Sequence, residues 1–193
     1  MSQIEEKTPK MQRNIYKKHR NPIKDMAAAA LLCALFCACA MINIPIVIPI
    51  TLQTLALSFG FFYLGGRITF AASLLYVAIG AVGVPVFAGF SGGVARLLDA
   101  TGGFIFGIAI SSLLYWLLEI IFKNKGAKRL LFAVIAHLAL YLSGALWFAL
   151  VYLGGGIEAF ISAIVTAVLP FIIPDGVKLI IAYVIAKRLP KLG

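Results

Sequence analysis

The sequence predicts an all-α membrane protein with six transmembrane helices, cytoplasmic N- and C-termini, and a short external or re-entrant helix before the last span. Composition is the first observation behind this fold class: 62% of the 193 residues are hydrophobic and 12% are charged, whereas soluble domains are roughly half apolar and about a quarter charged. The second is that the apolar residues form runs long enough to cross a bilayer. The third is that the basic residues lie between these runs.

The net charge of +10 could indicate a nucleic-acid partner, but the pattern of the charges argues against it. Lys and Arg flank the hydrophobic segments and do not form one continuous stripe. We therefore expect contact with a lipid bilayer and no binding of nucleic acid.

Residues 1–25 are predicted to form a basic cytoplasmic tail, and residues 26–189 a single six-helix transmembrane domain. The first span, 26–43, ends where two prolines, Pro45 and Pro49, interrupt the helix. Its sequence Ala38-Cys39-Ala40 also resembles a signal-peptide cleavage site. The small residues that recur every four positions favour a retained helix instead, because such a stripe suits helix packing in membranes.

The middle of the chain contains four predicted spans separated by short breaks. A Gly65-Gly66 turn and a glycine-rich, mostly non-helical segment at 85–103 provide two of these breaks. The spans themselves are predicted at about 52–64, 68–84, 104–122 and 130–152.

The last third of the chain is ambiguous. Residues 157–170 are apolar, but about 14 residues of helix measure roughly 21 Å, which is short of a hydrocarbon core of about 30 Å. Pro170 and Pro174 predict a break, with the last helix running from Pro174 to about Leu189. We therefore interpret 157–170 as a short external or re-entrant helix.

The distribution of basic residues orients this arrangement. With the six spans above, 15 of the 17 Lys and Arg residues fall on the cytoplasmic side, as the positive-inside rule predicts. A full span at 157–170 would place the basic C-terminal cluster outside. Only Arg96 and Lys178 lie elsewhere, and each is three residues from an acid, Asp99 or Asp175.

These two exceptions are the best candidates for a binding site. Residues i and i+3 share a helix face, and charges near membrane depth usually face a cavity or a partner. Gln53 follows the two-proline segment on the same predicted side and is flanked by Thr51 and Thr54. Further polar side chains could point there, namely Ser91, Tyr115, Tyr141 and Tyr152. A few polar groups in an apolar cleft suit a small, partly apolar anion. The alternative is two surface salt bridges, each worth about 0–1 kcal/mol.

Other chemistry is poorly supported. The sequence GFSG at 89–92 matches a motif of intramembrane serine proteases, with His137 as a conceivable base, but Ser91 lies in a glycine-rich loop. Cys33, Cys37 and Cys39 lie in one apolar segment without further ligands, so we expect no metal site. The sequence contains no G-x-x-x-x-G-K-[ST] phosphate loop, so no ATPase activity of its own is expected.

Three segments together resemble the BioY family, the biotin-specific substrate-binding (S) components of energy-coupling factor (ECF) transporters. They are PITLQT at 49–54, GVPVFAG at 83–89 with the glycine-rich run that follows, and LPFIIPDGVK at 169–178. The resemblance covers about residues 26–189. It implies high-affinity biotin binding on the external face of the bacterial plasma membrane, with biotin as transported substrate and no cofactor.

The resemblance also implies roles for individual residues. The polar positions of the site carry over as Gln53, Arg96, Asp175 and Lys178. Asp175 and Lys178 would bind the ureido group and Arg96 the carboxylate, although Arg96 and Lys178 could exchange these roles. The ring system would pack on aromatic groups, for which the candidates are Phe87, Phe90 and Tyr115.

The partners implied by the resemblance are a transmembrane coupling protein (the T component) and two cytoplasmic ATPases. Ala30, Ala34 and Ala38 resemble the small-residue surface with which S components contact the T component. Some family members could work alone. An intramembrane serine protease and a non-catalytic membrane scaffold remain the alternatives.

Overall fold

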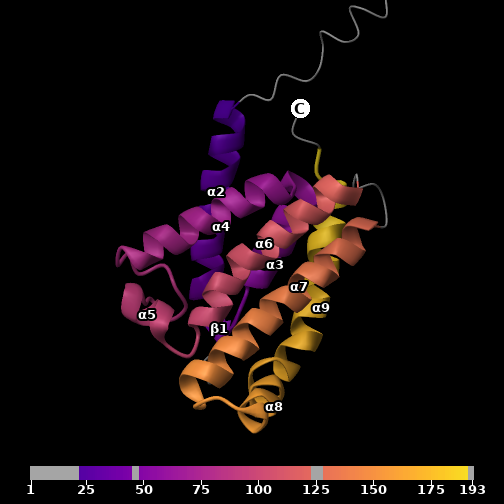
Figure 1. Ribbon diagram of the computed structural model, residues 1–193. Helices are drawn as coiled ribbons and strands as arrows, with labels where there is room; N and C mark the ends of the chain where they lie inside the picture. The colour runs from indigo at the N-terminus through magenta and orange to yellow at the C-terminus, as the bar shows by residue number, and fades with distance from the viewer. Residues whose placement is uncertain (1–21, 45–47, 123–127, 191–193) are drawn as a thin grey trace, which may run out of the picture.

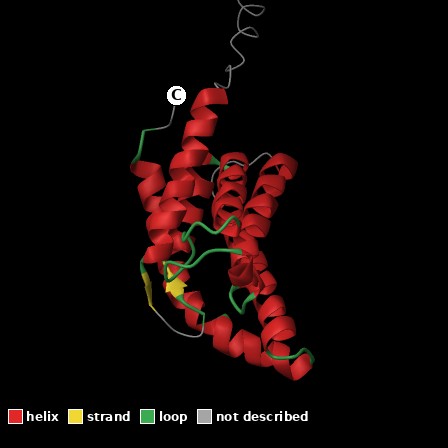
Figure 2. Cartoon of the chain, turned by 90° about the vertical axis from the view of Figure 1, so that its left-hand side faces the viewer, coloured by secondary structure: helices red, strands yellow, loops and turns green. Residues whose placement is uncertain are grey.

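The computed structural model describes residues 22–44, 48–122 and 128–190. Predictions about the tail before Pro22, about residues 45–47, and about Lys123, Lys125 and Lys191 lie outside these residues. The described chain is almost entirely helical, and its helices run side by side as a bundle (Figures 1 and 2).

The first helix, α2 (Pro22–Met41), begins four residues earlier than predicted. Proline is well suited to the first position of a helix, because its missing N–H would have no helical acceptor there. α2 ends before the two-proline segment, which is flanked by a short antiparallel ladder of β1 (Asn43–Ile44) and β2 (Ile50–Thr51). The first helix therefore ends before the two prolines, as predicted, and the strands on either side of residues 45–47 pair with each other.

The second predicted span is one continuous helical segment. It consists of α3 (Gln53–Phe59) and a π-helical stretch, η1 (Gly60–Leu64). Gly65, with φ of +86°, then turns the chain into α4 (Gly66–Ala81), which ends three residues before the predicted boundary. This φ value is one that glycine adopts without steric cost, which explains the predicted turn.

The glycine-rich segment contains a tight turn and a short helix, α5 (Val94–Leu98). Two long helices follow. They are α6 (Gly102–Phe122) and α7 (Lys128–Trp147), which continues as π-helical η2 (Phe148–Tyr152).

α6 and α7 pack closely because glycines lie at their contact. A Cβ atom on Gly103 would lie 2.1 Å from the Trp147 Cβ, and one on Gly144 would lie 2.3 Å from the Phe104 ring. Small residues at helix contacts are the usual solution inside membranes.

The end of the chain differs from the prediction. The short helix α8 (Ile157–Ala167) is present, but α9 spans Leu169–Arg188 and so begins five residues before Pro174. The break lies at Val168 (φ −123°, ψ −52°). Pro170 is tolerated in the first turn of α9, and Pro174 lies inside the helix. Pro170 therefore marks the start of α9, and α9 continues through Pro174.

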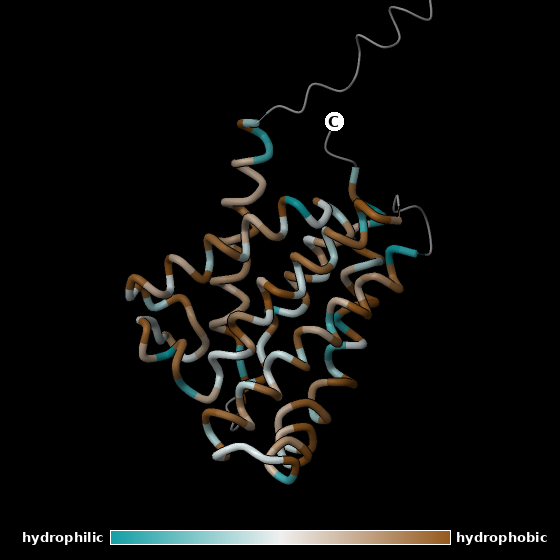
Figure 3. The backbone as a smooth tube through the Cα atoms, viewed as in Figure 1, coloured by the Kyte–Doolittle hydropathy of each residue, from teal (hydrophilic) through white to brown (hydrophobic). Residues whose placement is uncertain are grey.

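Four described helices are long and apolar enough to cross a membrane: Pro22–Met41, Gly102–Phe122, Lys128–Tyr152 and Leu169–Arg188. The other predicted spans correspond to shorter apolar helices, Gln53–Leu64 and Gly66–Ala81. Hydrophobic residues run along most of the bundle (Figure 3), and many large ones are exposed, among them Leu31, Ile120 and Ile173. This is the surface expected of a multi-pass membrane protein.

The ends of the helices alternate between the two ends of the bundle. Figure 1 shows that the start of α2, the end of α6, the start of α7 and the end of α9 lie together, while α8 lies at the opposite end. The residues between the helices are packed around large buried rings, such as those of Phe36, Tyr76 and Tyr115.

Candidate functional site

The most unusual feature of the interior is a buried ion pair on α9. Lys178 Nζ lies 2.7 Å from Asp175 Oδ1, and the two side chains are only 11% and 2% exposed. The pair forms because residues three apart share one face of the helix. Two charges removed from water cost several kcal/mol each unless their hydrogen bonds are satisfied.

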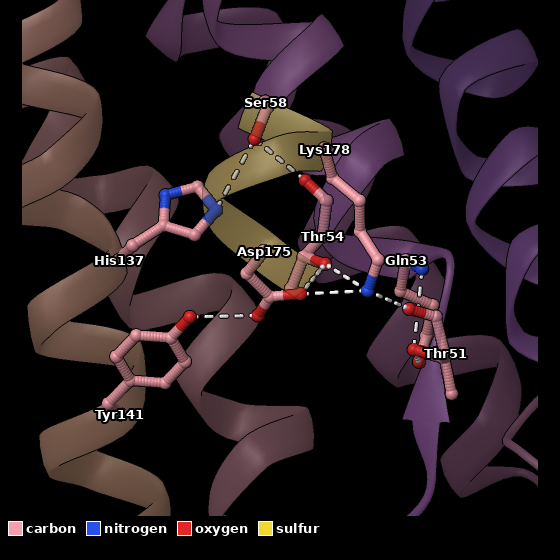
Figure 4. A network of polar contacts seen from close by, with 8 residues as sticks. All are labelled: Thr51, Gln53, Thr54, Ser58, His137, Tyr141, Asp175 and Lys178. Atoms are coloured by element: carbon pink, nitrogen blue, oxygen red, sulfur yellow. Dashed lines mark hydrogen bonds and ion pairs between the residues drawn. The ribbon is translucent and has the colours of Figure 1, made fainter. Parts of the chain in front are cut away.

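Those hydrogen bonds are supplied by three other segments (Figure 4). Lys178 Nζ also donates to the Thr51 carbonyl oxygen at 2.7 Å and to Thr54 Oγ1 at 3.3 Å. An ammonium group has three N–H donors, so each finds an acceptor. Asp175 Oδ1 accepts from Thr54 Oγ1 at 2.7 Å, and Oδ2 accepts from Tyr141 Oη at 2.8 Å. The pair thus joins α9 to β2, α3 and α7.

Asp175 keeps room for a further donor. A carboxylate offers about four lone-pair positions, and three donors occupy them, two on Oδ1 and one on Oδ2. By comparison, all three N–H donors of Lys178 are already used. Of the two residues, Asp175 is therefore better placed to accept a hydrogen bond from a ligand without breaking an existing one.

Gln53 is held beside this pair at the start of α3. Its Nε2 donates to Tyr76 Oη at 2.7 Å, and its Oε1 accepts from Thr51 Oγ1 at 3.1 Å. The side chain is therefore fixed in orientation although it is buried.

These polar groups line a cavity of about 70 Å³. The cavity is lined by Asp175, Gln53 and Arg96 together with mainly apolar groups. The remaining lining residues are Ile48, Pro49, Thr51, Thr54, Tyr76, Phe87, Ala88, Thr101, Phe104, Ile105, Ile108, Leu140, Tyr141 and Phe171. Lys178 lies behind Asp175 and contacts the site through that carboxylate.

The second predicted charge pair contributes Arg96 to the cavity lining. Arg96 on α5 donates from Nη1 to Asp99 Oδ2 at 2.7 Å, and the side chains are 27% and 45% exposed. Asp99 Oδ1 in turn accepts from the Ala100 N–H at 2.7 Å. The structure thus brings Gln53, Arg96 and Asp175 to one cavity.

Of the predicted aromatic contacts, Phe87 lines the cavity, where it is 1% exposed and packs edge-on against Tyr76. Phe90, Ser91 and Tyr115 do not line it. Phe90 is 72% exposed at the tip of the turn closed by the Phe87–Ser91 bridge, with φ of +56°. Ser91 Oγ donates to the Ala88 carbonyl oxygen at 2.8 Å.

Tyr115 lies too far along α6 to reach the cavity. It is seven residues beyond Ile108, or roughly 10 Å along the helix axis. Its ring stacks on Phe61 with centroids 4.2 Å apart. Phe90, Ser91 and Tyr115, which the sequence suggested as site residues, therefore lie outside the lining of this cavity.

The arrangement needed for a serine protease is not what these side chains form. His137 Nε2 lies 3.3 Å from Ser58 Oγ, and Nδ1 lies 2.9 Å from the Ala133 carbonyl oxygen. Ser91, the proposed nucleophile, is instead bonded within its own turn. The geometry gives the GFSG motif no base.

Sequence reasoning missed Tyr76, which orients Gln53, and Phe171, which lines the cavity. Phe171 lies one helical turn before Asp175, so helical spacing could have found it. Tyr76 carries no such local signal. Thr54 and Tyr141, which the sequence placed on the same side as Gln53, bond Asp175 directly.

The comparisons with known proteins agree with this architecture. The family model described as the BioY family matches residues 10–193. A probable biotin transporter BioY from Pyrococcus horikoshii is 38% identical over 167 residues, which cover 86% of this chain and 96% of that protein. The biotin transporter BioY of Thermotoga maritima is 31% identical over 171 residues, covering 88% of this chain and 98% of that protein.

A solved structure has the same fold. The crystal structure of the S-component for biotin from an ECF-type ABC transporter superposes with a TM-score of 0.75 at 23% identity, covering 91% of this chain and 95% of that one. Because the family model covers nearly the whole sequence, this multi-pass membrane protein belongs to the BioY family.

Proposed function

We propose that this protein binds biotin in the cavity beside Asp175 and supports its uptake as the S component of an ECF transporter. The observation that carries the proposal is the buried Asp175–Lys178 pair at the wall of a mainly apolar cavity. Relatives of nearly the same length are named biotin transporters. The protein is thus a binding and transport subunit rather than an enzyme.

The chemistry of biotin suits the two polar parts of the cavity. The ureido group has two N–H donors and one carbonyl, and Asp175 has acceptor capacity left for a donor. Lys178 could reach a ligand oxygen, such as the ureido carbonyl, only by giving up its hydrogen bond to Thr51 or Thr54. Because the same loss would follow if Lys178 bound the carboxylate, we assign the carboxylate to Arg96. The apolar wall, including Phe87 and Phe171, suits the ring system.

The proposed membrane arrangement has six crossings with both termini in the cytoplasm. Residues 1–25 form a basic tail and 26–189 the transmembrane domain. The shared end of α2, α6, α7 and α9 in Figure 1 supports this, as do Lys187 and Arg188 at the end of α9. α3–η1 and α4 are the two shorter crossings, and α8 lies at the external end. Cysteine accessibility labelling at residues in the 123–129 loop and near Glu158 tests the two sides.

The proposed partners are a T component and two ATPases, with α2 as the docking helix. Ala30, Ala34 and Ala38 are all exposed on α2, so their stripe is open to a neighbouring helix. Ala34→Leu should reduce biotin uptake in cells and leave biotin binding unchanged. Loss of binding with intact uptake would contradict this role.

The central test is calorimetric titration of purified protein with biotin, with thiamin and riboflavin as comparison ligands. Only biotin should bind tightly. Asp175→Asn should weaken binding by about 1–3 kcal/mol, because a charged acceptor becomes a neutral amide. Thr166→Val on exposed α8 is the matched surface control. If Asp175→Asn and Lys178→Ala both bind biotin as the wild type does, the site is wrong.

A further inference from the structure

Two buried polar atoms at the cavity have no hydrogen-bond partner among the described residues. They are Thr101 Oγ1 and Arg96 Nε, and no other buried side-chain N or O atom in the described chain shares this state. Both residues line the cavity. Because native interiors satisfy nearly all buried polar groups, an unpaired pair at one site calls for an explanation.

The position of Thr101 in the fold does not explain why its buried hydroxyl lacks a hydrogen-bond partner. Its carbonyl oxygen accepts from the N–H groups of Phe104 at 3.1 Å and Ile105 at 3.3 Å, so Thr101 is the N-cap residue of α6. A threonine at this position normally accepts a backbone N–H with its hydroxyl. Here the hydroxyl makes no such bond, and the residue is only 7% exposed.

Arg96 is likewise only partly used by the fold. Asp99 takes Nη1, while Nε is left without a partner. Asp99 is anchored in turn, because its carbonyl oxygen accepts from Trp147 Nε1 at 2.9 Å and from the Gly102 N–H at 2.9 Å. The guanidinium is thus held through Nη1, and its Nε–H can donate a hydrogen bond to another acceptor.

The same place is the N-terminus of α6, a helix of 21 residues. The positive end of a helix dipole stabilises an anion, and helix N-termini commonly bind carboxylates and phosphates. The residues that carry the unpaired hydroxyl and the unpaired guanidinium N–H both line the cavity, and Thr101 does so at the N-terminus of α6.

We propose that Thr101 is a specificity-determining residue: its hydroxyl donates a hydrogen bond to the ligand carboxylate, alongside Arg96 Nε, at the N-terminus of α6. This rests on the proposed function, in which biotin is the ligand. Thr101 then distinguishes ligands whose side chain ends in a carboxylate from otherwise identical uncharged ones.

The test compares two ligands by calorimetric titration of detergent-solubilised protein. One is biotin, and the other is its analogue with a methyl group in place of the carboxylate. Thr101→Val removes the hydroxyl at nearly constant shape and should weaken biotin binding roughly 10- to 100-fold. It should change binding of the methyl analogue by less than about twofold. Thr101→Ser keeps the hydroxyl and should retain most of the affinity for biotin.

The outcomes separate this inference from the proposed function. If wild-type protein does not bind biotin, the proposed function fails. If wild-type protein binds biotin and Thr101→Val binds it as tightly, Thr101 does not bind the carboxylate. The same conclusion follows if Thr101→Val loses affinity equally for biotin and for the methyl analogue. Thr166→Val, in which an exposed hydroxyl bonded to the Ser162 carbonyl is removed, should leave both affinities unchanged.

Discussion

Two ion pairs with the same local geometry and opposite surroundings each contribute one residue, Asp175 or Arg96, to the cavity lining. Asp175 and Lys178 are three residues apart with an N–O distance of 2.7 Å, and so are Arg96 and Asp99. The side chains of the first pair are 11% exposed or less, whereas those of the second are 27% and 45% exposed. Sequence spacing fixes the pairing, and the environment decides what each pair does.

The two pairs differ in how many of their hydrogen-bonding groups have partners within the protein. The buried pair has hydrogen bonds from three neighbouring segments, and all three donors of Lys178 are used. The outer pair leaves Arg96 Nε without a partner. We infer that the inner pair, Asp175 and Lys178, is preorganised before a ligand arrives. In the outer pair, the ligand supplies the missing hydrogen-bond partner of Arg96. A preorganised site saves the ordering cost of binding.

The largest expected difference between the pairs is in stability. Lys178→Met leaves the Asp175 carboxylate buried without its cation and should destabilise the protein by about 3–5 kcal/mol. Arg96→Met breaks an exposed pair and should cost about 0–1 kcal/mol. Thermal unfolding of both variants in the same detergent measures the contrast.

The control for this contrast is the double variant Asp175→Asn with Lys178→Met. It removes both charges, so it should recover most of the stability that Lys178→Met loses. Equal, small losses for Lys178→Met and Arg96→Met would show that the inner pair is solvated like the outer one.

A smaller effect is expected from the hydroxyl that bonds Asp175 from α7. Tyr141→Phe removes a donor to a charged acceptor, a bond worth about 1.5–3 kcal/mol. Unfolding and biotin titration should both register the loss. Tyr183→Phe is the matched control, because the Tyr183 ring packs edge-on against Phe62 on η1. If Tyr141→Phe behaves like this control, the hydroxyl does not help to hold Asp175.

The contrast also shows what sequence reasoning could reach. Arg96 and Lys178 were found because they break the positive-inside pattern, and their partners were found because spacing of three places them on one face. The helices beside Pro170 and Pro174 were misjudged. We interpreted each proline as a break, although α9 contains Pro170 in its first turn and Pro174 in its interior.

Contacts between distant segments were the part that sequence could not supply. Thr54 and Tyr141 lie 121 and 34 residues from Asp175, and their meeting depends on how α3 and α7 are rotated. The direction of Phe90 has a related cause. It lies three residues after Phe87, at the tip of the turn that the Phe87–Ser91 bridge closes, so that Phe87 is 1% exposed and Phe90 is 72% exposed. Neither rotation nor turn direction is encoded in hydropathy.

The smallest expected effect concerns Asp99, and it tests whether the outer group is completed by the ligand. Asp99→Asn removes the negative charge and keeps one of the two oxygens, which can accept from Arg96 or from the Ala100 N–H. Stability should change by less than about 1 kcal/mol, because the pair is exposed. A ligand carboxylate no longer competes with a neighbouring anion, so biotin affinity at low salt should stay equal or rise slightly. The gain should shrink at high salt through screening. A marked loss of affinity would mean that the charge of Asp99 holds Arg96 in place as firmly as the inner pair is held.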